Sequence, residues 1–166
     1  MSFSKNGAPR RLKSCVHAIT VGLIFLGVFS TPSVATAQTN VSYSEQPLIV
    51  RNDRGGLLRE RLREISQLRQ QSRPVEIRGA VCYSTCTMFL GLPNTCISPD
   101  TTFGFHGPSS YGRTLDPDTF SRASLIIASH YPAPLKDWYM NRARYKIHSI
   151  YRVKGENIIR MGVRAC

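Results

Sequence analysis

The fold is decided by residues 48–81, which read LIVRNDRGGLLRERLREISQLRQQSRPVEIRGAV. The apolar run over 48–50 predicts a buried strand. The Asn-Asp-Arg-Gly-Gly run over 52–56 predicts a turn, because Asn, Asp and Gly tolerate positive φ. Residues 57–69 predict a helix with one buried stripe and its charged residues, Arg61 among them, on the other faces. The stripe is Leu58, Leu62, Ile65 and Leu68. Pro74 ends this helix, and residues 75–81 predict a second strand.

The remaining chain continues the alternation. We expect a short apolar helix over 84–92, a strand over 95–98 and an extended piece over 102–106. After a loop at 107–110 come three helices, near 120–130, 135–145 and 155–161, the first capped by Asp116 or Asp118, and a last extended piece from Val163. Strands and helices joined by short turns predict an α/β fold, a parallel sheet covered by helices.

The N-terminus is typical of a secretion signal. Basic residues precede an apolar stretch of about 15 residues, which is short of the roughly 20 that a membrane span needs. Ala35-Thr36-Ala37 has the A-x-A form of a cleavage site. We therefore predict a signal peptide over 1–37, a flexible lead-in over 38–46 and one domain over 47–166. The mature protein is expected to be periplasmic or secreted, with no membrane span.

The charge and the length limit the function classes. Removing residues 1–37 from 166 leaves 129, enough for one core. It leaves 18 basic and 10 acidic residues, a net charge of +8. The basic residues are spread out, which predicts a solvated face, and nucleic acid is not an expected partner of an exported protein.

Four cysteines remain in the mature chain: Cys82, Cys86, Cys96 and Cys166. In an oxidising compartment they predict two disulfides. A zinc site is the rival use, but no His lies at ligand spacing among them, so we expect no metal. The preferred pairing is Cys82–Cys86 with Cys96–Cys166, because a pair four residues apart across a strand-to-helix turn can meet. Cys86–Cys96 with Cys82–Cys166 is the main alternative.

Three segments in order resemble the Clp protease proteolytic subunit and crotonase superfamily, over roughly residues 47–166. The 52–56 turn with its helix is similar to the family's Asn-Ser-Pro-Gly-Gly turn. Residues 79–86, GAVCYSTC, resemble the strand and sharp turn that present the serine nucleophile, and residues 99–106, PDTTFGFH, resemble the stretch that ends in the catalytic histidine. The resemblance implies a small sheet of that fold, truncated at its N-terminal side, with Ser84 as nucleophile and His106 as base.

The residues themselves predict the same chemistry. A serine at a strand-to-helix turn lies at a helix N-terminus, where backbone N–H groups are free. The N–H groups of Gly56 and Thr85 can then stabilise an oxyanion, while His106 accepts the Ser84 proton. Each residue has a structural alternative: Ser84 as a helix cap, His106 as a structural histidine, and Gly55-Gly56 as an ordinary turn.

One member of the expected triad is missing. The family's orienting Asp would fall near Ser149, where the sequence has no acid, and Asp116, Asp118 and Asp137 are the remaining candidates. Two hypotheses follow. The first is an exported serine hydrolase acting on peptides or proteins, without cofactor and without an ATP-driven unfoldase. The second is a non-catalytic, disulfide-stabilised binding module on the same fold. Neither defines an oligomeric state.

Overall fold

We describe the fold from a computed structural model, which describes residues 46–166; the predicted signal peptide and most of the lead-in lie outside this range. The strands are β1 (Leu48–Asp53), β2 (Val75–Tyr83), β3 (Thr95–Ile97), β4 (Thr102–Phe105) and β5 (Tyr151–Lys154). The α-helices are α1 (Leu58–Gln70), α2 (Pro117–Ala128), α3 (Ala133–Asn141) and α4 (Gly155–Arg160), and two 3₁₀ helices are η2 (Ser84–Gly91) and η3 (Ala143–Tyr145).

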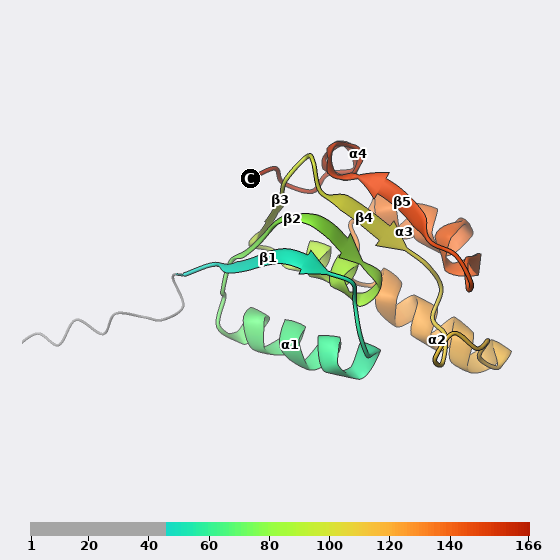
Figure 1. The fold of residues 1–166 in the computed structure, drawn as a ribbon. Coiled ribbons are helices and arrows are strands. Elements are labelled where there is room, and N and C mark those ends of the chain that lie inside the picture. Colours follow the sequence, from blue (N-terminus) through green and yellow to red (C-terminus); the bar gives the residue numbers. More distant parts are fainter. Residues whose placement is uncertain (1–45) are drawn as a thin grey trace, which may run out of the picture. The chain divides into compact units, whose positions relative to one another are not determined.

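The strands form one open sheet in the order β1–β2–β4–β5, with β3 also paired to β2 (Figure 1). The long strand β2 is central: its first half pairs with β3 and its second half with β4, all parallel. The predicted α/β class with a largely parallel sheet is therefore confirmed. One strand departs from the predicted parallel sheet, because β5 pairs antiparallel with β4. Its alternating half-buried and exposed residues were not recognised as a strand.

The predicted turn at 52–56 begins later than expected, because β1 continues through Asn52 and Asp53. The register between β1 and β2 shifts beyond Val50, and the Asn52 Oδ1 accepts the Ala80 N–H at 3.0 Å. This side chain thus supplies a partner where the regular ladder is interrupted. Gly79 is required opposite the shift, since a Cβ there would overlap the Arg51 carbonyl.

The core lies between the sheet and the helices beneath it in Figure 1. The predicted stripe of α1 packs against it, with Ile65 and Leu68 buried and Leu58 and Leu62 partly buried. Burying such side chains contributes about 1.5–3 kcal/mol each. The largest fully buried side chains are Tyr139, Phe89, Phe103 and Phe105. Among residues 46–166, no helix is both long and apolar enough to cross a membrane.

The C-terminal segment is attached to β3. The Cys166 N–H donates to the Ile97 carbonyl at 3.0 Å, and Ala165 forms a parallel bridge with Ile97. The Cys96–Cys166 disulfide reinforces this contact. The preferred pairing of the cysteines is confirmed here and at Cys82–Cys86.

Candidate active site

Ser84 lies where the sequence predicts it, at the sharp turn between β2 and η2. Its φ is +57°, a left-handed conformation that is uncommon for a residue with a Cβ. Such strain costs on the order of 1–3 kcal/mol and occurs most often at functional sites. In α/β-hydrolases a strained strand-to-helix turn of this kind presents the nucleophilic serine.

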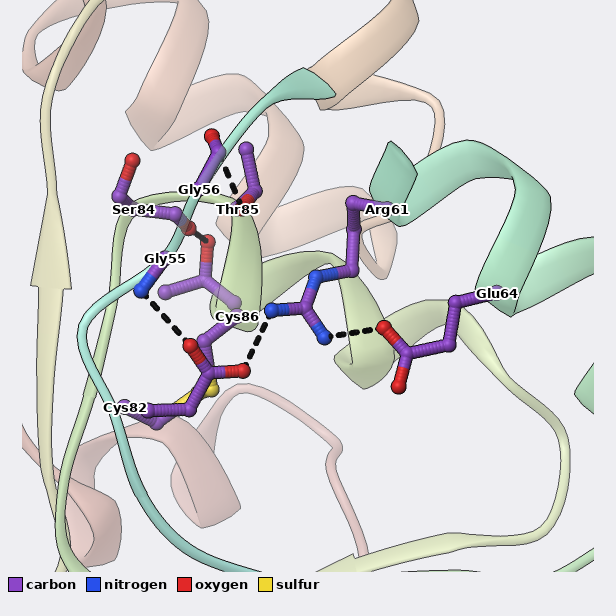
Figure 2. Close-up of polar contacts among 10 residues, drawn as sticks. Gly55, Gly56, Arg61, Glu64, Cys82, Ser84, Thr85 and Cys86 are labelled. Atoms are coloured by element: carbon purple, nitrogen blue, oxygen red, sulfur yellow. Dashed lines mark hydrogen bonds and ion pairs between the residues drawn. A yellow bond between two sulfur atoms is a disulfide. The ribbon is translucent and has the colours of Figure 1, made fainter. Parts of the chain in front are cut away.

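The Cys82–Cys86 disulfide holds the two sides of this turn together. Its Cα atoms are 5.3 Å apart, and both cysteines are fully buried. Cys82 belongs to β2 and Cys86 to the first turn of η2. In Figure 2 the Ser84 hydroxyl points away from this disulfide. The disulfide therefore constrains the turn on its buried side, and the Ser84 hydroxyl lies on the opposite side.

The Gly55–Gly56 turn lies directly beside Ser84. Gly55 has a φ of +91°, and a Cβ built on it would lie 2.9 Å from the Ser84 Oγ. The Thr85 Oγ1 donates to the Gly56 carbonyl at 3.4 Å, so the two predicted oxyanion residues are in contact (Figure 2). Within residues 46–166 the Gly56 N–H has no hydrogen-bond acceptor.

A cavity of about 460 Å³ opens at this turn. Ser84, Thr85 and Gly56 line one side of it, and His106 lines it as well. The sequence-predicted site residues are thus brought to one cavity. Much of the remaining wall is apolar: Leu57, Leu58, Leu115, Ala123, Ile127 and Tyr131. None of the described residues that line the cavity is Asp, Glu, Lys or Arg, so the cavity suits an uncharged group.

His106 follows the end of β4, and its ring has one backbone partner. The Nδ1 lies 2.7 Å from the Gly107 carbonyl oxygen. Because a carbonyl only accepts, Nδ1 must carry the proton in this bond, and Nε2 keeps the lone pair that a general base needs. Gly107 is itself fixed, since its N–H donates to the Lys146 carbonyl at 2.9 Å.

No carboxylate in the described part of the chain bonds to the His106 ring. Asp116 instead caps α2 by accepting the Thr119 N–H at 2.9 Å, and this bond lowers its pKa. Of the two proposed caps, Asp116 is thus the one used. No hydrogen bond joins the Ser84 Oγ to His106 within residues 46–166.

Sequence reasoning missed two groups beneath the site. Arg61, predicted on a solvent-facing side of its helix, is buried, with its guanidinium 4.3 Å from the Phe89 ring centroid and paired with Asp53. The second group is Thr87 with Tyr131, whose hydroxyl oxygens are 2.6 Å apart. Thr87 also donates to the Ser84 carbonyl at 2.7 Å, so Tyr131 is the donor to Thr87. Neither group has a sequence signature, because each joins distant elements.

Residues 46–166 contain no cluster of three or more His, Cys, Asp or Glu that could hold a metal ion. Two comparisons with known proteins gave no relative. No protein-family model matches the chain, and no curated protein matches it.

Proposed function

We propose that this protein is an exported serine hydrolase, a peptidase in which Ser84 is the nucleophile and His106 the base. The observation that carries the proposal is the strained Ser84 turn opening on the same cavity as His106. The bond from Nδ1 to the Gly107 carbonyl supports it, because it orients the ring and leaves Nε2 as a proton acceptor. The resemblance to the Clp protease and crotonase superfamily agrees with this assignment.

The reaction would follow the usual order of acyl transfer. The Ser84 Oγ attacks the scissile carbonyl carbon while its proton passes to the His106 Nε2. The N–H groups of Gly56 and Thr85 donate to the resulting oxyanion, and each such donor typically contributes about 3 kcal/mol. The amine leaves with the proton from His106, and water then hydrolyses the acyl-enzyme by the same steps. This mechanism requires Ser84 and His106 to come within hydrogen-bond reach when substrate binds, as catalytic pairs often do.

A carbonyl is a weaker partner for the imidazolium than a carboxylate. In a triad, loss of the orienting acid can lower turnover by about four orders of magnitude. We therefore expect slow turnover. The two disulfides are typical of proteins that fold outside the cytoplasm and support the export part of the proposal.

The test uses a fluorophosphonate probe on the mature protein. Wild type should be labelled at Ser84, and Ser84→Ala should not be labelled. His106→Ala should label far more slowly, and the double variant should hydrolyse activated esters no more slowly than the worse single variant, because the pair acts as a unit. Absence of label from folded wild type would favour the binding module, which the missing Ser84–His106 hydrogen bond also favours.

A further inference from the structure

Asp53 is the last residue of β1, and both oxygens of its carboxylate have a partner. Its Oδ1 accepts the Gly55 N–H at 2.7 Å, and its Oδ2 is paired with the Arg61 guanidinium (Figure 2). The carboxylate therefore ties the turn before α1 to a side chain from within α1. A charge-assisted bond of this kind is roughly twice as strong as a neutral one.

Arg61 is unusual among the basic residues of its helix, because it is buried. Only 9% of its side chain is exposed, whereas Arg59, Arg63 and Arg69 are exposed. The Asp53 side chain is 23% exposed, so the pair is largely buried, and such a pair is weak evidence for stability, since hydrophobic residues of similar volume often do as well. Its second partner, the Glu64 Oε2 at 2.7 Å, completes the arrangement. What the Asp53–Arg61 pair adds is a fixed position for the Asp53 oxygens.

The Gly55–Gly56 turn has few hydrogen bonds besides the one that the Asp53 carboxylate accepts. Within residues 46–166, neither Gly55 nor Gly56 forms a backbone–backbone hydrogen bond. The Gly55 N–H is committed to Asp53 and the Gly56 carbonyl to Thr85. The Gly56 N–H has no acceptor within residues 46–166, and Gly56 lines the same cavity as Ser84.

We propose that Asp53, held by Arg61, is a positioning residue that presets the Gly55–Gly56 turn as one half of the oxyanion hole. The Asp53 side chain fixes Gly55, and through it aims the Gly56 N–H at the substrate carbonyl. This inference rests on the proposed hydrolase function.

Two double variants isolate the hydrogen bond from the ion pair. Both carry Arg61→Met; one adds Asp53→Asn, which keeps an oxygen for the Gly55 N–H, and the other adds Asp53→Ala, which removes it. We expect Ser84 labelling by the fluorophosphonate to be about 10- to 100-fold slower in the Ala variant than in the Asn variant, the loss of much of one oxyanion donor. With an activated ester, kcat should fall and KM should stay unchanged, a split that general loosening of the fold would not produce.

The matched control is Glu76→Gln, which breaks the ion pair between Glu76 and Arg78 away from the turn and should label at the wild-type rate. Equal labelling of the two double variants, beside a labelled wild type, would overturn this inference and leave the hydrolase proposal standing. An unlabelled wild type would overturn both. If the double variants do not fold, hydrogen exchange of the Gly55 amide in wild type decides, because an unprotected amide there contradicts a fixed turn.

Discussion

Gly55 lies so close to Ser84 that no side chain fits between them: a Cβ on Gly55 would lie 2.9 Å from both the Ser84 Oγ and the Tyr83 carbonyl oxygen. Gly55, which precedes the proposed oxyanion donor Gly56, therefore packs directly against Ser84, the proposed nucleophile. Its φ of +91° adds a second requirement for glycine. The two halves of the site, one after β1 and the other after β2, are thus in direct contact.

Gly55→Ala is expected to slow fluorophosphonate labelling of Ser84 by at least about tenfold, because displacing one oxyanion donor costs that much or more. It should also lower the free energy of unfolding by roughly 1–3 kcal/mol through strain and overpacking. Gly162→Ala is the control, since Gly162 has a φ of +99° with no atom within 4 Å. It should lower stability and leave labelling unchanged. Equal labelling of Gly55→Ala and wild type would contradict the proposed contact.

The positive φ of Ser84 predicts that glycine and alanine at this position reverse their usual order of stability. At an ordinary helical position glycine is less stable than alanine by about 0.5–1 kcal/mol. At Ser84 the order should reverse, with Ser84→Gly more stable than Ser84→Ala by about 1 kcal/mol, because only glycine adopts a φ of +57° without cost. Both variants lack the hydroxyl, so the comparison isolates the backbone.

Denaturant unfolding of the two Ser84 variants measures this difference. The same pair of changes at Ser66, which is exposed on α1, should show the ordinary order with alanine more stable. Ser84→Ala more stable than Ser84→Gly would mean that the turn is not strained in solution.

The sequence predicted those features that depend on neighbours along the chain. The α1 stripe, the strand ending before Ser84 and the helix after it all follow from local patterns. The cysteine pairing followed from one short-range argument, that Cys82 and Cys86 are four residues apart across a turn. Ser84 and His106 were paired through the resemblance of residues 79–86 and 99–106 to the Clp protease and crotonase superfamily, and both residues line one cavity.

What could not be predicted depends on contacts between distant segments. Arg61 was assigned to a solvated face by helical periodicity, yet Asp53 and the Phe89 ring make its burial favourable. The partner of the His106 Nδ1 is a backbone carbonyl, which has no residue signature at all. The strand β5 has a local signal in the alternation of Tyr151–Lys154, but its antiparallel pairing with β4 depends on a distant segment.

The two disulfides are expected to differ in what their loss affects. In the chain-entropy account, a bridge closing a short loop contributes about 2 kcal/mol, whereas one closing a loop of about 70 residues contributes about 4 kcal/mol. Cys96→Ser/Cys166→Ser, which opens the link of sequence separation 70, should therefore lower stability more. Cys82→Ser/Cys86→Ser should lower it less and slow Ser84 labelling more. Thermal unfolding and labelling, measured on both pairs, give the comparison; a larger labelling defect in the Cys96/Cys166 pair would contradict a role for Cys82–Cys86 at the turn.

The buried tyrosines predict a loss of stability at alkaline pH. Burial raises the pKa of Tyr131 and also that of Tyr139 above the ordinary value of about 10. The unfolded chain therefore releases these protons at lower pH than the folded chain does. Since the folded state then binds more protons, the free energy of unfolding falls as pH rises above about 10. The stability that these protonated tyrosines contribute is fully present below that pH.

Tyr131→Phe should flatten this dependence, at a cost near neutral pH of about 1 kcal/mol for the lost hydrogen bond to Thr87. Urea midpoints between neutral and alkaline pH measure the slope. Tyr111→Phe is the control, because Tyr111 is 91% exposed, and it should keep the wild-type slope. A Tyr131→Phe variant that loses stability with pH as steeply as wild type would show that Tyr131 is not held protonated in the folded state.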